Sequence, residues 1–256
     1  DTLIITLTNV SELKSAERSR LEALNFLSHD LRSPMVSVLA ILELQRKRLK
    51  RQQKNSVTSE QPKTNQSDES FLQDIELLVR KNLSYADSFL QLSRAQSLTE
   101  DKLQLCDMHA VIDSAQMQGL ALAKSKSIEL MTQRTSLDAW VMGDHDALER
   151  AIINLLSNAV KYSDSNTQIT LSITTNDSDV LVAVSDQGHG IAHEDIDKLF
   201  DRFTRGKKTH EEMGAGLGLN YVATVAKRHH GEIQVTSQEN QGSCFTLRIP
   251  LENDEL

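Results

Sequence analysis

The sequence predicts a helical hairpin followed by an α+β sandwich. The hairpin is indicated by two segments whose apolar residues recur at alternating steps of three and four, and by the polar residues 52–70 between them. The sandwich is indicated because, from about Asp107, helical stretches alternate with short apolar and β-branched runs. We therefore expect a hairpin domain over residues 11–103 and a sandwich domain over residues 104–256, with residues 1–10 as the strand-like end of an upstream domain.

Composition limits the classes of function. Of the 256 residues, 39% are apolar and 4% aromatic, so the expected cores are mainly aliphatic. A formal charge of -8 argues against nucleic-acid binding, because such binding depends on cationic contacts to phosphates. Cys106 and Cys244 have no metal-ligand or redox spacing, which fits a reducing, cytoplasmic compartment. No apolar run approaches the roughly 20 residues of a membrane helix, so no membrane contact is expected within these residues.

The first helix of the hairpin is expected from about Ser11 to Arg51. Seven of the nine positions of its seam are apolar, the seam being Leu21, Leu24, Ser28, Leu31, Met35, Val38, Leu42, Gln45 and Leu49. The second helix has a seam of the same spacing, formed by Phe71, Ile75, Leu78, Asn82, Tyr85, Phe89 and Leu92. Because two narrow seams cannot enclose a core alone, we expect two hairpins to pair into a four-helix bundle, as a homodimer.

His29 lies one position beyond the seam and is expected to point away from the centre of the hairpin. Pro34 follows in the same helical pattern, where it removes a backbone N–H and loosens the helix. Two interpretations stay open for these residues alone. An exposed histidine beside a proline is most often an ordinary surface residue. Alternatively, its neutral imidazole is a nucleophile oriented by the carboxylate of Asp30.

The sandwich domain is expected to contain three helices and four strands. The helices are expected over residues 108–124, 144–160 and 221–228, and the strands over residues 169–174, 180–185, 232–236 and 244–249. In the second of these helices, Asn154 and Asn158 share one face beside Lys161. Amide oxygens suit Mg²⁺ and a lysine suits phosphate, although a plain helix surface explains the same residues.

Two glycine-rich segments follow. In Asp186-Gln187-Gly188-His189-Gly190, the carboxylate could accept a hydrogen bond from the exocyclic amine of adenine, and the glycines allow a tight turn. An ordinary turn at the end of a strand explains the same residues. Gly214, Gly216 and Gly218 lead into a helix whose N-terminus offers N–H groups to phosphates. This loop matches neither the dinucleotide fingerprint nor the P-loop. Residues 201–213 are expected to form a mobile lid.

Taken in order, these segments resemble the motifs of the sensor histidine kinases of two-component systems, over residues 11–251. The H-box, N-box, first glycine box, F-box and second glycine box of that family are similar to residues 29–34, 154–162, 186–190, 199–203 and 214–219. The resemblance implies a HisKA-type dimerisation and phosphoacceptor domain followed by an ATP-binding domain of the Bergerat (GHKL) fold. It also implies a cytoplasmic kinase core, with a PAS-like sensor and any anchor in the bacterial inner membrane lying before Asp1.

The resemblance implies a phosphotransfer reaction at the hairpin. ATP would phosphorylate His29, oriented by Asp30, and the phosphoryl group would pass to an aspartate in the receiver domain of a response regulator. Ser33, four places after the histidine, stands where some members carry a residue used to dephosphorylate that partner. Threonine or asparagine is more usual there.

The resemblance also implies roles in the sandwich domain. Asp186 would recognise adenine with Tyr162 near the base, and Asn158, supported by Asn154, would hold Mg²⁺. The other groups implied to contact the nucleotide are Lys161, Gly188, Gly190, Arg205, Gly214, Gly216, Leu217 and Gly218.

Two other functions stay open at this point. A Bergerat-fold ATPase, such as a chaperone or topoisomerase subunit, would share the nucleotide motifs but has no use for an exposed histidine in an upstream hairpin. A dimeric scaffold with a decayed nucleotide site would have lost at least one of the expected asparagine, aspartate or glycine positions. None of these is lost in the sequence.

Overall fold

The computed structural model describes residues 36–44, 47, 66–201 and 216–252. The chain divides into two compact units, Asp1–Phe89 and Leu90–Leu256. Most of the first expected helix, with His29, Asp30 and Ser33, lies outside the described residues. Among the helices that are described, none combines the length and apolar character needed to cross a lipid bilayer.

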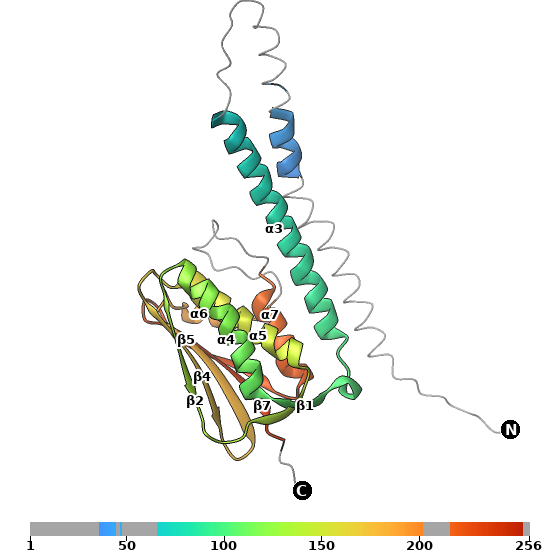
Figure 1. The fold of residues 1–256 in the computed structure, drawn as a ribbon, viewed down its shortest axis with the longest axis vertical. Helices are drawn as coiled ribbons and strands as arrows, with labels where there is room; N and C mark the ends of the chain where they lie inside the picture. The colour runs from blue at the N-terminus through green and yellow to red at the C-terminus, as the bar shows by residue number, and fades with distance from the viewer. Residues whose placement is uncertain (1–35, 45–46, 48–65, 202–215, 253–256) are drawn as a thin grey trace, which may run out of the picture. The chain divides into compact units, whose positions relative to one another are not determined.

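Helix α3 spans Gln66–Gln96 and contains the second predicted seam (Figure 1). All of the described seam positions are buried or half-buried: Ile75, Leu78, Asn82, Tyr85, Phe89 and Leu92. The expected end of the preceding loop at residue 70 was wrong, because residues 66–70 are helical.

The second unit is built around a five-stranded mixed sheet with the order β2-β4-β5-β7-β6. Its strands are β2 (Glu129–Arg134), β4 (Gln168–Thr175), β5 (Asp179–Asp186), β6 (Glu232–Gln238) and β7 (Gly242–Pro250). Only β2 and β4 pair in parallel, and the other three pairings are antiparallel. Two short strands, β1 (Gln104–Asp107) and β3 (Trp140–Gly143), form a separate antiparallel pair.

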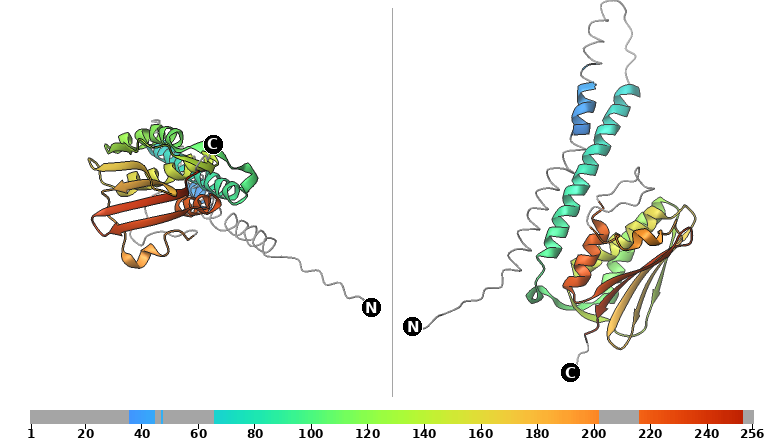
Figure 2. Two further views of the ribbon diagram at one scale, coloured as in Figure 1. Left: turned by 90° about the horizontal axis from the view of Figure 1, so that it is seen from below. Right: turned by 180° about the vertical axis from the view of Figure 1, so that it is seen from behind.

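Three helices cover one face of this sheet (Figures 1 and 2). They are α4 (Met108–Ser125), α5 (His145–Tyr162) and α7 (Gly218–Arg228), with α5 packed against both of the others. The short helices α6 (His193–Ile196) and η1 (Glu100–Lys102) complete the unit. Along β4, Ile169, Leu171 and Ile173 are fully buried, while the alternate residues are half-buried or exposed. This period of two is that of a sheet covered on one face, which confirms the predicted sandwich of helices on a mostly antiparallel sheet.

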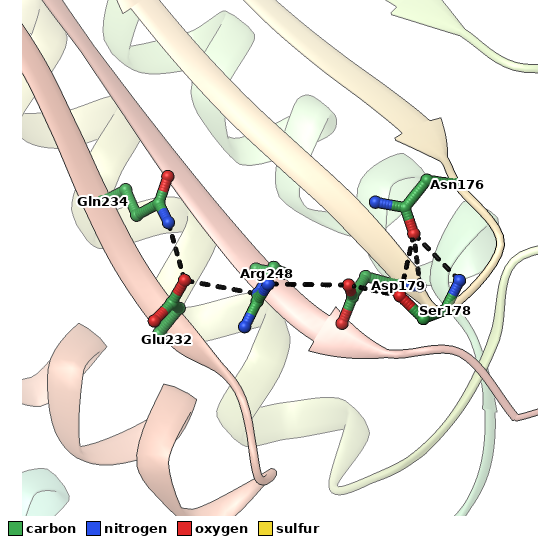
Figure 3. Close-up of polar contacts among 6 residues, drawn as sticks. All are labelled: Asn176, Ser178, Asp179, Glu232, Gln234 and Arg248. Atoms are coloured by element: carbon green, nitrogen blue, oxygen red, sulfur yellow. Dashed lines mark hydrogen bonds and ion pairs between the residues drawn. The ribbon is translucent and has the colours of Figure 1, made fainter.

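An ion-pair network joins three strands at the end of β5 opposite to Asp186 (Figure 3). Arg248 on β7 lies 3.7 Å from Asp179 Oδ2 and, through Nε, 3.3 Å from Glu232 Oε1. Asn176 Oδ1 accepts the backbone N–H of Asp179 at 2.7 Å in the turn before β5. Because Arg248 is 43% exposed, each pair stabilises the fold by only about 1 kcal/mol or less.

His229 is a buried histidine that joins α7 to α5. Its Nδ1 lies 2.8 Å from the carbonyl oxygen of Val225, and its Nε2 accepts the backbone N–H of Asp144 at 3.0 Å. Both bonds require the neutral ring with its proton on Nδ1. The side chain is 1% exposed, and burial lowers the pKa of this histidine from its usual range.

The stability of the fold is therefore expected to depend on pH through His229. A histidine titrates near pH 6.5 in the unfolded chain and below that in the folded one, so only the unfolded chain gains a proton between these values. The stabilisation is complete above about pH 6.5 and is lost as the pH falls toward the folded pKa. Urea unfolding at pH 7.5 and 5.5 measures it. We expect the free energy of unfolding to fall further in wild type than in His229→Gln between these two pH values. Equal losses would contradict this origin.

Candidate nucleotide-binding site

Helix α5 supplies four of the predicted site residues. It buries Leu148, Ile152 and Leu155 against its neighbours. Asn154 and Asn158, one turn apart, are only half-buried and lie together on a flank of the helix, beside this buried stripe. Asn154 Nδ2 donates to the carbonyl of Arg150 at 3.0 Å. Its Oδ1 faces the first turn of α7, because a Cβ atom placed on Gly218 would lie 3.2 Å from it.

Lys161 and Tyr162 close the C-terminal end of α5. Lys161 Nζ lies 3.2 Å from the Tyr162 hydroxyl and 4.7 Å from the centroid of its ring. An ammonium at this distance from an aromatic face is held by the ring's quadrupole. A flat ring and a positive charge thus stand together at the end of the helix that carries the two asparagines.

Asp186 is the last residue of β5 and is 8% exposed. Its Oδ1 accepts two backbone N–H groups, from Gly188 at 2.8 Å and from Ser243 at 3.3 Å. Burial raises the pKa of this carboxyl group, and the two hydrogen bonds oppose that rise. Oδ2 makes no hydrogen bond within the described part of the chain. The carboxylate is therefore fixed through one oxygen and has the other available as an acceptor.

The glycine turn after Asp186 packs directly on backbone from both sides. A Cβ atom on Gly188 would lie 2.4 Å from the carbonyl oxygen of Tyr162, and the same carbonyl accepts the N–H of His189 at 3.3 Å. Gly190 has φ +65°, and a Cβ atom there would lie 1.9 Å from the carbonyl oxygen of Gln238. Only glycine fits such approaches. The turn is wedged between the end of α5 and the end of β6.

Helix α7 begins at Gly218, next to Asn154. Gly216 has φ +67°, and Leu217, which is 2% exposed, precedes the helix without capping it through a side chain. The first N–H groups of α7 lie at the positive end of the helix dipole, and the N-cap residue Leu217 does not cap them through its side chain, an arrangement that suits phosphate. Asn220 in the same turn donates from Nδ2 to the carbonyl of Phe200 at 2.8 Å.

Two separate segments thus meet α5 beside its own half-buried residues: the glycine turn at Tyr162 and the α7 N-terminus at Asn154. The predicted residues in this group are Asn154, Asn158, Lys161, Tyr162, Asp186, Gly188, Gly190, Gly216, Leu217 and Gly218. Leu217 is buried, so it could meet a ligand only through its backbone. Arg205, Gly214 and most of the predicted lid over residues 201–213 lie outside the described residues, as do His29, Asp30 and Ser33.

Sequence reasoning missed two side chains that shape this region. His229 holds the N-terminus of α5 through Asp144, and Lys126 holds its C-terminus by donating to the carbonyls of Val160 and Lys161. A lysine just after a predicted helix end was visible at position 126. Its partners, however, lie on another helix and cannot be deduced from spacing along the chain.

The family model and the relatives that match the chain agree on one family of proteins. Residues 143–253 match the family described as histidine kinase-, DNA gyrase B-, and HSP90-like ATPase. The chain is 30% identical over 96% of its length to the sensor-like histidine kinase SenX3 of Mycolicibacterium smegmatis, and 27% identical over its full length to the sensor histidine kinase WalK of Bacillus subtilis. It spans 62% and 40% of the lengths of those two proteins.

Solved structures show the same fold. The mycobacterial sensor histidine kinase MprB matches 58% of the chain and 99% of the solved chain, with a TM-score of 0.53 at 27% identity. Full-length ShkA, solved in complex with AMPPNP, matches 91% of the chain and 46% of the solved chain, with a TM-score of 0.61 at 24% identity. Together with the motif order and the sandwich, these relationships establish that the chain belongs to the sensor histidine kinases.

Proposed function

We propose that this chain is the core of an ATP-dependent protein-histidine kinase, with His29 as the phosphate acceptor. The observation that carries the proposal is the convergence on α5 of Asp186, the glycine turn and the α7 N-terminus. An acceptor for an amine, a flat ring and the backbone N–H groups of a helix N-terminus match the base and the phosphates of one nucleotide. Lys161 and, from outside the described residues, Arg205 add positive charge for the triphosphate.

The reaction that follows is an in-line phosphoryl transfer. A ring nitrogen of His29 forms a bond to the γ-phosphorus while the bond from that phosphorus to the β–γ bridging oxygen breaks, and ADP leaves. Asp30 accepts a hydrogen bond from the other ring nitrogen and orients the imidazole. Most of the rate enhancement comes from positioning and charge neutralisation, which the residues at α5 are suited to provide.

The donor groups on α5 fit a magnesium ion bound with the nucleotide. Mg²⁺ prefers oxygen ligands and usually keeps several waters while bridging phosphates. Asn158 makes no side-chain hydrogen bond within the described residues, and Asn154 presents Oδ1 toward the start of α7. We propose that Asn158 holds the ion with support from Asn154. When bound, Mg²⁺ supplies neutralisation of phosphate charge.

We further propose that residues 11–103 act as a homodimeric four-helix bundle, that residues 104–256 act as the catalytic domain, and that residues 1–10 end a sensor domain. The apolar residues Leu83 and Leu90 on α3 are 61% and 52% exposed, which supports association with a second copy. The partner in signalling would be the receiver domain of a response regulator. Ser33 keeps a hydroxyl that could orient water for its dephosphorylation.

The chemical stability of the phosphorylated product tests this function. The chain is incubated with γ-labelled ATP and Mg²⁺, and the labelled protein is treated with acid and with alkali. We expect a label that acid removes and alkali leaves in place, because phosphohistidine is acid-labile. Release of free phosphate without labelled protein would favour a Bergerat-fold ATPase instead. Nucleotide binding with neither label nor phosphate release would favour a scaffold.

A further inference from the structure

The C-terminal end of α5 is held from two sides. The last four carbonyl groups of an α-helix have no partner within the helix. In α5 these four belong to Ala159, Val160, Lys161 and Tyr162, and all four accept a hydrogen bond. The carbonyl of Ala159 accepts the N–H of Ser163 at 3.1 Å, and the carbonyl of Tyr162 accepts the N–H of His189 at 3.3 Å. Lys126 Nζ donates to the two remaining carbonyls, that of Val160 at 3.2 Å and that of Lys161 at 2.9 Å.

Lys126 reaches this position because the turn after α4 is fixed to the loop after α5. Lys126 is the C-cap residue of α4. The next residue, Ser127, has φ +57°, and its carbonyl accepts the N–H of Asn166 at 2.9 Å. Glu129 donates its N–H to the carbonyl of Thr167 at 3.0 Å. The ammonium therefore sits at the negative end of the α5 dipole, where a cation is favoured.

The held helix end is in direct contact with the base side of the nucleotide site. Gly188 packs on the carbonyl of Tyr162 so closely that even a methyl group would not fit between them, and its N–H donates to Asp186 Oδ1 at 2.8 Å. A small shift of the last turn of α5 must therefore move the glycine turn and, with it, the carboxylate. The connection runs from Lys126 through Tyr162 and Gly188 to Asp186.

We propose that Lys126 is a positioning residue for the base-binding side of the site. This inference rests on the proposed function, since it assumes that Asp186 and Tyr162 meet adenine. Lys126 is half-buried, so water can replace its ammonium at the two carbonyls when the charge is removed. The loss should therefore appear in nucleotide affinity more than in stability.

The experiment compares Lys126→Met with Lys126→Arg and with Lys124→Met. Lys124 is an exposed lysine in the last turn of α4 and serves as the matched control. Dissociation constants for Mg²⁺-AMPPNP and Mg²⁺-ADP are measured by calorimetry, with thermal unfolding in parallel. We expect Lys126→Met to raise both constants by about tenfold, the scale typical of removing a supporting contact. Arginine should restore affinity to within about twofold, and Lys124→Met should change neither constant.

Comparing the two nucleotides distinguishes a positioning role of Lys126 from a direct electrostatic contact between Lys126 and the phosphates. Because the affected groups lie on the base side, the losses for AMPPNP and ADP should be equal, and the KM for ATP should rise while kcat is retained. Wild-type affinity in Lys126→Met, a larger loss for AMPPNP than for ADP, or a loss that arginine does not restore would each overturn the inference. Failure of the wild-type chain to bind either nucleotide would instead contradict the proposed function.

Discussion

Replacing His29 with alanine is expected to abolish labelling of the chain by γ-labelled ATP, to less than about 1% of wild type. Alanine has no nucleophile, and a reaction that depends on one attacking nitrogen has no substitute group at that position. Nucleotide affinity should be unchanged, because the residues proposed to bind nucleotide all lie in the unit Leu90–Leu256. Calorimetry with AMPPNP checks the second point on the same preparation.

The chain has eight histidines, and one of the seven other than His29 serves as the control. His145 is well suited, because its side chain is 43% exposed and takes no part in the proposed site. His145→Ala should be labelled like wild type. Persistent label in His29→Ala would remove His29 as the acceptor, and loss of label in His145→Ala would show that the labelling does not report on one histidine.

Replacing Asp186 with asparagine is expected to weaken binding of AMPPNP and of ADP by roughly 100-fold each, since a lost charged hydrogen bond with an unpaired donor costs about 2–3 kcal/mol. The substitution keeps the shape of the side chain. Oδ1 can still accept the N–H groups of Gly188 and Ser243, so the fold is preserved. At the other position an amide N–H₂ would meet the amine of adenine, donor against donor. Isothermal titration calorimetry measures the loss.

Stability and a second variant complete this test. Burial disfavours the charged carboxylate of Asp186 and raises its pKa, whereas the neutral amide of Asp186→Asn is not disfavoured in this way. The free energy of unfolding of the variant should therefore be unchanged or slightly higher. Asp177→Asn makes the same charge change in the exposed turn at the opposite end of β5 and should bind nucleotide normally. Undiminished affinity in Asp186→Asn would exclude this carboxylate from the base site.

The fold was predictable where periodicity was strong. The expected helices near residues 108–124 and 144–160, and the four expected strands, all occur with small changes of their ends. Strands β1, β2 and β3 were not predicted. In β2, Glu129 and Arg134 are exposed and only Leu130 and Thr132 are half-buried, so an edge strand leaves little alternation to detect. β1 and β3 are four residues each, too short to show a period.

The candidate site was predictable as a set of residue types, and not as a geometry. Motif order selected Asn154, Asp186 and Gly218 before any contact was known. The contacts that fix them join residues far apart in sequence, as when Ser243 donates to Asp186 or His229 accepts from Asp144. Such contacts follow from the packing of whole elements, which local patterns do not determine.

The single parallel pairing in the sheet has a consequence for how the domain folds. β4–β5 and β6–β7 are hairpins with short connections, so their contacts are local and close with little loss of chain entropy. β2 must find β4 across β3 and all of α5, and β5 must find β7 across α6, α7 and β6. Sheets dominated by such distant pairings form in roughly milliseconds to seconds, against microseconds for a hairpin. The candidate site around α5 draws on β5, β6 and α7 together, so we expect it to be complete only after these distant strand pairings have formed.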